Sequence, residues 1–101
     1  MGNGLIERSW YALAPDGTGH ELVLRIMTPT LHPKGHWVAP TSLGVLEERI
    51  HDIAGIDGWQ AVGLAMRFTA RMIDHYEEKG WQFYWEQDGE RLHSSDRFDF
   101  A

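Results

Sequence analysis

The residues of this chain best suited to chemistry are two histidines and several carboxylates. His32 and His36 lie four residues apart, a spacing at which two imidazoles can bind one zinc ion. Zinc sites use three or four ligands, and no cysteine or carboxylate is placed beside this pair. We therefore interpret both histidines as surface loop residues, and we predict neither a metal site nor a cofactor.

The carboxylates do not form the pair that general acid–base catalysis requires. Glu47 and Glu48 are neighbours on an expected strand, so their side chains point to opposite faces. Asp74 and Glu78 flank His75 near the end of an expected helix, where such a group ordinarily forms a solvated surface. Acidic groups there oppose the helix dipole at a cost of about 0.3–1 kcal/mol, which weakly indicates a use in partner binding.

The sequence contains no activated nucleophile. It has no cysteine and no Gly-x-Ser-x-Gly turn, and its serines have no base in their context. The glycine-rich pieces at residues 2–4 and 17–19 are too short for phosphate-binding loops, and neither lies between a strand and a helix. We predict no catalytic residue. Whether the chain is an enzyme stays open at this point, and a non-catalytic role is favoured.

Length and charge narrow the class of protein. The 101 residues are expected to form one compact domain, with residues 94–101 as a loose tail. The net charge of −6 disfavours nucleic-acid binding and suits a basic protein partner. No stretch approaches the roughly 20 apolar residues of a membrane span, and the N-terminus lacks a signal-peptide pattern. With no cysteine, these features predict a cytoplasmic protein that does not bind membranes.

Aromatic residues are the surplus of this composition, which includes five tryptophans. Each tryptophan can bury about 150–250 Å², either in the core or in an interface. Aromatic side chains rimmed by acid, on a sheet face that no helix covers, are typical of a protein-binding surface. The residues that we predict for such a surface are Trp10, Trp37, Tyr84, Glu47, Glu86, Phe98 and Phe100.

One long helix is predicted between Asp57 and Gly80. Asp57 suits the N-cap, and Gln60 can bond back to the Asp57 N–H to complete a capping box. Gly80 suits a left-handed C-cap. Helical spacing puts one apolar stripe on a single face: Ala61, Val62, Ala65, Phe68, Thr69, Met72, Ile73 and Tyr76. The small residues Ala61 and Ala65 would let the helix approach a sheet closely.

Strands are predicted on both sides of this helix. Alternating or aromatic-rich runs place them at residues 5–13, 20–28, 36–39, 43–53 and 81–86, with a brief return at 91–93. Residues 28–35 read as an irregular loop, and Pro40 should end the third strand or displace it to an edge. Consecutive strands joined by short turns pair antiparallel. The prediction is a two-layer α+β fold with an antiparallel sheet of four to five strands and one helix on one face.

The run from Gly55 to Ala65 resembles a family of small bacterial proteins of unknown function. In that family a Gly-[Val/Ile]-Asp-x-x-Gln-Ala segment opens the long helix after three strands. Further similar positions are Arg8, Trp10, Asp16, Gly17, Trp37 and Pro40, and the similarity spans most of residues 5–85. The resemblance implies the fold and the capped helix, and the family has no established activity to carry over.

Three functional hypotheses follow from the sequence. The first is a small protein-binding module, such as an immunity or inhibitor protein, that neutralises a more basic partner. The second is a homo-oligomer, such as a homodimer, formed through the uncovered sheet face or the strand at 81–86. The third is a small-ligand or enzymatic site between the helix start and the loop at 29–40, using His32, His36 and Trp59.

Overall fold

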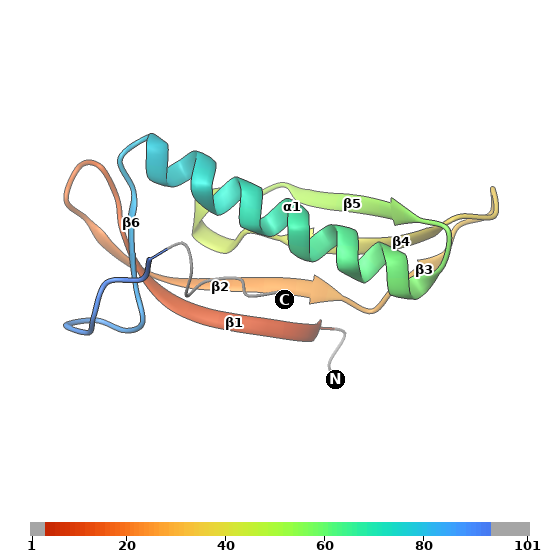
Figure 1. Cartoon of the computed structure of the whole chain (residues 1–101), viewed down its shortest axis with the longest axis horizontal. Helices are drawn as coiled ribbons and strands as arrows, with labels where there is room; N and C mark the ends of the chain where they lie inside the picture. The colour runs from red at the N-terminus through yellow and green to blue at the C-terminus, as the bar shows by residue number, and fades with distance from the viewer. Residues whose placement is uncertain (1–3, 94–101) are drawn as a thin grey trace.

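The computed structural model describes residues 4–93, which form an antiparallel sheet with one long helix on one face (Figure 1). The α+β class is confirmed, and the sheet has six strands rather than the four to five predicted. In chain order the elements are β1 (Gly4–Leu13), β2 (Gly19–Met27), β3 (Thr30–Leu31), β4 (Trp37–Ser42), the 3₁₀ helix η1 (Gly44–Leu46), β5 (Ile50–Gly55), α1 (Gly58–Glu78) and β6 (Gln82–Tyr84).

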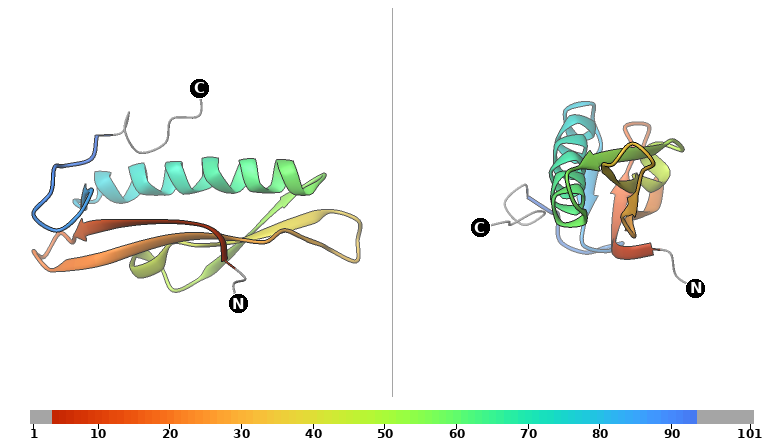
Figure 2. Two further views of the ribbon diagram at one scale, coloured as in Figure 1. Left: turned by 90° about the horizontal axis from the view of Figure 1, so that it is seen from below. Right: turned by 90° about the vertical axis from the view of Figure 1, so that its right-hand side faces the viewer.

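The strands form one sheet in which β2 is central, between β1 and β4. β1 pairs with β2 on one side and with β6 on the other, while β4 pairs with β2, β3 and β5. All of these pairings are antiparallel, as expected for strands joined by short turns. Figure 2 shows α1 lying along one face of this sheet, and the opposite face carries no helix of the described chain.

The ends of α1 follow the predicted signals with one difference. Asp57 Oδ1 accepts a hydrogen bond from Gln60 N at 2.8 Å, which confirms the N-cap. Gln60 Oε1 instead accepts from Ile56 N at 2.8 Å, so the predicted bond to the Asp57 N–H is wrong by one residue. Asp57 itself has the extended backbone typical of an N-cap residue, with φ −150 and ψ 177. Gly80 has φ +107, the predicted left-handed end.

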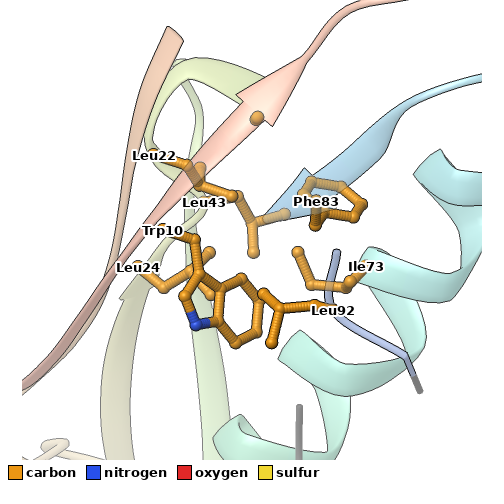
Figure 3. Packing of buried hydrophobic residues seen from close by; sticks show 8 residues of the cluster. Trp10, Leu22, Leu24, Leu43, Ile73, Phe83 and Leu92 are labelled. Atoms are coloured by element: carbon orange, nitrogen blue, oxygen red, sulfur yellow. The ribbon is translucent and has the colours of Figure 1, made fainter. Parts of the chain in front are cut away.

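The main core lies between the second half of α1 and the β1–β2–β6 part of the sheet (Figure 3). Its buried members are Trp10, Ala12, Leu22, Leu24, Leu43, Ile73, Phe83 and Leu92. Phe68, Met72 and Tyr76 pack against this core from the helix, as the stripe predicts. The helix face is therefore assigned correctly by its period, with Ile73 fully buried at its centre.

A second, smaller core lies under the first half of α1. Ala61 and Ala65 are fully buried there against Ile26 and Ala39, and Trp37 packs on the same cluster. The two alanines let the helix sit close to the sheet. A Cβ added to Gly55, at the end of β5, would lie 2.5 Å from the Ala61 nitrogen, so β5 passes the helix at backbone contact.

The strand predicted at residues 43–53 is wrong in its first half. Leu43 turns into the main core, and Gly44 takes φ +58 to begin η1. A side chain at Gly44 would lie 2.6 Å from the Val23 carbonyl oxygen, so glycine permits this approach. Regular pairing resumes at Ile50, which is where β5 begins.

Smaller differences concern Pro40 and the last strands. Pro40 lies inside β4, between the stretch that pairs with β3 and the stretch that pairs with β2, where its missing N–H can be tolerated. The predicted loop at 28–35 contains the two-residue strand β3. β6 is shorter than 81–86, and the predicted return is confirmed by a bridge between Tyr84 and Arg91.

Candidate functional site

The two faces of the β1–β2 hairpin carry different side chains. Trp10 and Leu22 are opposite each other and point into the main core beneath α1. Because side chains alternate along a strand, the next pair, Tyr11 and Glu21, points to the face without a helix. We call that side of the sheet the open face. Val23, which is opposite Ser9 and two ladder positions from the Tyr11–Glu21 pair, is half-buried on the open face.

A hollow of about 560 Å³ includes Tyr11 and Glu21 of this face in its lining. It lies where the β1–β2 hairpin meets the turn that follows β6. We call it the aromatic–acidic hollow, and the side chains that define it are Ser9, Tyr11, Glu21, Trp85, Glu86 and Gln87.

The aromatic rings of this region are held by strand pairing and by one glycine. Tyr11 is opposite Tyr84 in the β1–β6 ladder, and their ring centroids are 6.5 Å apart. The Tyr84 hydroxyl donates to Gln82 Oε1 at 2.9 Å. Tyr11 also lies over Gly19, where an added Cβ would fall 1.5 Å from the Tyr11 hydroxyl. The absence of a side chain at Gly19 therefore fixes where the Tyr11 ring can lie.

Two carboxylates give the hollow its charge. Glu21 and Glu86 are exposed, and no lysine or arginine lines the hollow. His20 also lines it, and the Arg8 guanidinium carbon lies 5.6 Å from the centroid of the Trp85 ring. Among residues 4–93, neither carboxylate has an ion pair with a basic side chain. Glu7 on the same face differs, because Arg25 Nε lies 2.5 Å from its Oε2 and neutralises it. Aromatic rings beside carboxylates suit a cation, through ring–cation attraction and charge-assisted hydrogen bonds.

The structure brings only some of the predicted partner-binding residues together. Tyr84 lies on the open face beside Tyr11, and Glu86 lines the aromatic–acidic hollow. Phe98 and Phe100 lie outside the described residues.

The two predicted tryptophans lie elsewhere. Trp10 is only 2% exposed and belongs to the main core, so its placement on the uncovered face is wrong. Trp37 packs under the start of α1, where a Cβ at Gly58 would lie 3.8 Å from its ring. Both residues occupy inward positions of their strands, and this alternation removes them from a surface role.

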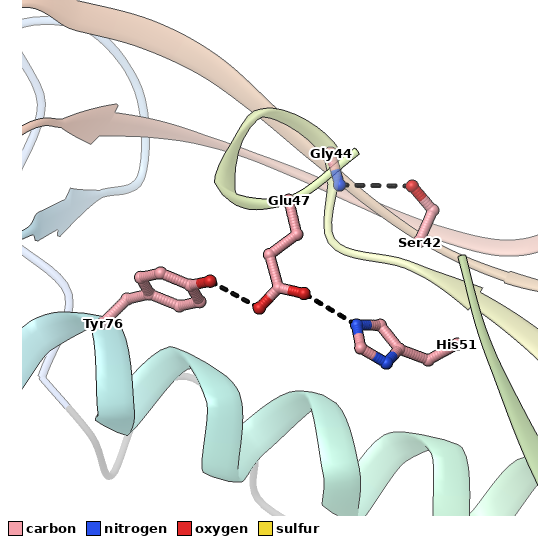
Figure 4. Close-up of polar contacts among 5 residues, drawn as sticks. All are labelled: Ser42, Gly44, Glu47, His51 and Tyr76. Carbon is pink, nitrogen blue, oxygen red and sulfur yellow. Dashed lines mark hydrogen bonds and ion pairs between the residues drawn. The ribbon is translucent and has the colours of Figure 1, made fainter. Parts of the chain in front are cut away.

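Glu47 also lies on the helix side of the sheet, in a polar network with Tyr76 and His51 (Figure 4). The Tyr76 hydroxyl donates a hydrogen bond to Glu47 Oε2, and His51 Nε2 lies 2.8 Å from Glu47 Oε1. The hydrogen bond from Tyr76, with help from His51, lowers the pKa of the Glu47 carboxyl below its ordinary value of 4.5. Burial, together with the bond to Glu47, raises the pKa of Tyr76 to about 12.

This network connects elements rather than facing a binding space. Glu47, His51 and Tyr76 line neither the aromatic–acidic hollow nor the hollow beside Trp59 on α1. Glu47 follows η1, His51 is in β5, and Tyr76 is in the last turns of α1. The network therefore fastens the η1–β5 connection onto the helix.

The histidines of the third hypothesis do not meet Trp59 in a hollow. The rings of His32 and His36 stack at 4.4 Å, and the Lys34 N–H donates to His32 Nδ1 at 3.0 Å. Trp59 lines a separate hollow on α1, with neither histidine among the lining residues. Within residues 4–93, no three His, Asp or Glu side chains gather as a metal site would require.

Sequence reasoning missed Tyr11, Glu21 and Trp85. The signal for the first two was present, because the clean alternation of β2 and the tight turn after Leu13 together set the hairpin register. The imperfect alternation of β1 hid which of its neighbouring aromatic residues, Trp10 or Tyr11, faces outward. Trp85 follows β6 at the point where the chain leaves the sheet, and alternation carries no information there.

The chain matches no known protein family, and neither a curated protein nor a solved structure matches it significantly. No helix in the described part of the chain is long and apolar enough to cross a membrane.

Proposed function

We propose that this chain is a protein-binding module whose aromatic–acidic hollow takes a basic side chain of a partner protein. The observation that carries this proposal is the position of Glu21 and Glu86, which line one hollow with the rings of Tyr11 and Trp85. An arginine suits such a hollow best, because its planar guanidinium can bind a carboxylate and stack on a ring at once.

The remainder of the open face supplies apolar contact area that does not line the hollow itself. Leu13, Val23, Val38 and Pro40 are half-buried there, and Ile50 is 46% exposed. A mixed apolar surface with polar and acidic members is the usual composition of a transient protein interface. The net charge of −6 adds long-range attraction for a basic partner and raises the rate of encounter.

The specific form that we favour is an inhibitor or immunity-type protein that neutralises a more basic partner. Three features support it: the small size, the acidic charge and a hollow that carries two carboxylates. The resemblance to small bacterial proteins of unknown function is compatible with this form and adds no activity to it.

Capture of a partner from an extract of the source organism tests the proposal when it is combined with a charge-neutral variant. The double variant Glu21→Gln, Glu86→Gln removes both charges of the hollow and keeps their size. We expect a basic protein to bind the unmodified chain and to bind the double variant about tenfold more weakly, or ~1.4 kcal/mol. Higher salt should weaken binding to the unmodified chain more than binding to the double variant.

The matched control is Glu48→Gln, Glu78→Gln, which removes two exposed carboxylates that do not line the hollow. It should lower affinity only slightly, through the change in net charge. Equal affinity of the captured protein for the unmodified chain and the hollow variant would overturn the proposal, and so would capture of no basic protein.

A further inference from the structure

The first half of α1 carries an exposed apolar patch on a flank of the helix, next to the stripe that packs on the sheet. Trp59 is 91% exposed, which is the largest value among the large hydrophobic residues described, and Ile56 before the helix is 77% exposed. Leaving an indole in water forfeits a burial of about 150–250 Å². A surface tryptophan at this exposure, next to a second apolar residue, marks an interaction surface.

A hollow of about 540 Å³ lies directly beside this indole. It is lined by Trp59, Val62, Gly63, Met66 and Arg67, and its surface is mostly apolar. Gly63 forms its flat floor, since a Cβ added there would have no neighbour within 4 Å. A projecting ring and a hollow that could accept a ring therefore lie one helical turn apart on one face of the same helix.

We infer that two copies of this chain associate through this patch, with their α1 helices antiparallel and crossing at Gly63. A knob and a hollow on the same surface are self-complementary, and a two-fold axis places each Trp59 in the hollow of the other copy. The missing side chain at Gly63 lets the two helix backbones approach each other closely.

The charges of the helix favour a second copy over other partners. Arg67 is the only charged residue between Gly58 and Ala70. Trp59 and Arg67 lie four residues on either side of Gly63, so an antiparallel crossing puts each indole level with the other copy's guanidinium. That contact is attractive, because a cation over the face of an indole is stabilised by the ring. No pair of like charges meets at the axis.

This association is independent of the proposed binding of a basic partner. The patch lies on a flank of α1, whereas the aromatic–acidic hollow is lined by residues of β1, β2 and the turn after β6, and the two hollows share no lining residue. Both hollows of a dimer would stay accessible. The dimer would therefore present two sites for basic side chains, and a partner with two basic segments would bind with increased avidity.

Sedimentation of the full chain over a range of concentrations tests the inference, together with two variants. Trp59→Glu removes the projecting indole and adds a charge. Gly63→Leu fills the floor of the hollow that would receive the indole of the other copy. Glu48→Leu is the matched control, because it adds the same apolar side chain at an exposed position away from the helix. Circular dichroism confirms that each variant is folded, and leucine in place of a helical glycine should raise the melting temperature.

We expect the unmodified chain and Glu48→Leu to dimerise with the same dissociation constant in the micromolar range. Both patch variants should be folded monomers over the same range, a loss of at least tenfold in affinity. A strict monomer of the unmodified chain at the highest concentration would overturn the inference. Dimers of unchanged affinity in both patch variants would overturn it as well, since another surface would then be responsible.

Discussion

The hydroxyl of Tyr76 on α1 donates a hydrogen bond to the carboxylate of Glu47, which follows η1. The second oxygen of that carboxylate meets His51 Nε2 of β5 at 2.8 Å. Since a carboxylate can only accept, His51 must carry its proton on Nε2 for this bond to form. One half-buried carboxylate thus joins the connection between η1 and β5 to α1, twenty-nine residues further along the chain (Figure 4).

Removing the hydroxyl group of Tyr76 should lower the free energy of unfolding. Tyr76→Phe leaves the ring in the core and deletes one hydrogen bond to a charged acceptor, a contribution of about 1.5–3 kcal/mol. Denaturant unfolding measures the change in the free energy of unfolding. Tyr84→Phe is the control, because its hydroxyl bonds to the uncharged Gln82 on the open face and should matter less. Equal losses in the two variants would contradict a special role for the Glu47 network.

Acid should weaken the network in a defined direction. The folded pKa of Glu47 is below its ordinary value of 4.5, so the folded state favours the ionised form. This contribution to stability is complete above pH 4.5 and is lost as the pH falls through the lower folded pKa. Unfolding free energies measured across the acid range should fall less steeply for Glu47→Gln than for the unmodified chain. Parallel profiles would show that Glu47 does not supply this dependence.

High pH should weaken the same hydrogen bond by ionising the hydroxyl group of Tyr76. The pKa of Tyr76 is raised from 10.0 to about 12, so the folded state favours the neutral phenol. The resulting stabilisation is complete below pH 10 and is lost as the pH rises toward 12. Titration of tyrosinate absorbance should show one late-ionising phenol that disappears in Tyr76→Phe. Its persistence in that variant would assign the late group to another tyrosine.

The contact between β5 and the helix predicts opposite effects for two glycines. Gly55→Ala would place a Cβ 2.5 Å from the Ala61 nitrogen, so the backbone must shift at a cost of about 1–3 kcal/mol. Gly63→Ala meets nothing within 4 Å and should stabilise the helix by about 0.5–1 kcal/mol. Thermal unfolding at low protein concentration compares the two. A stabilising Gly55→Ala would mean that the close approach is not tight.

The helix could be predicted from the sequence because its signals are local. The cap at Asp57, the left-handed Gly80 and the apolar stripe each depend only on residues close by in the sequence. All three are present in the structure. The fold class followed from the order of the elements. The turn at Gly44 could not be predicted in this way, because it depends on Val23, a residue of another strand.

The candidate site could be predicted only in part, for a similar reason. Glu86 and Tyr84 lie on the predicted side of the sheet. The aromatic residue of β1 on that side is Tyr11 and not Trp10, and the choice between neighbours depends on which one the core can enclose. Glu47 is drawn to the helix by Tyr76, twenty-nine residues away in sequence, a contact that no local pattern encodes.

The most direct test of the central claim is a nuclear magnetic resonance titration with N-acetyl-arginine methylamide, a minimal basic side chain. We predict saturable shifts at Tyr11, Glu21 and the Trp85 indole, which are lost in Glu21→Gln, Glu86→Gln and kept in Glu48→Gln, Glu78→Gln. Shifts spread evenly over the acidic surface, or shifts that persist in the hollow variant, would contradict the account.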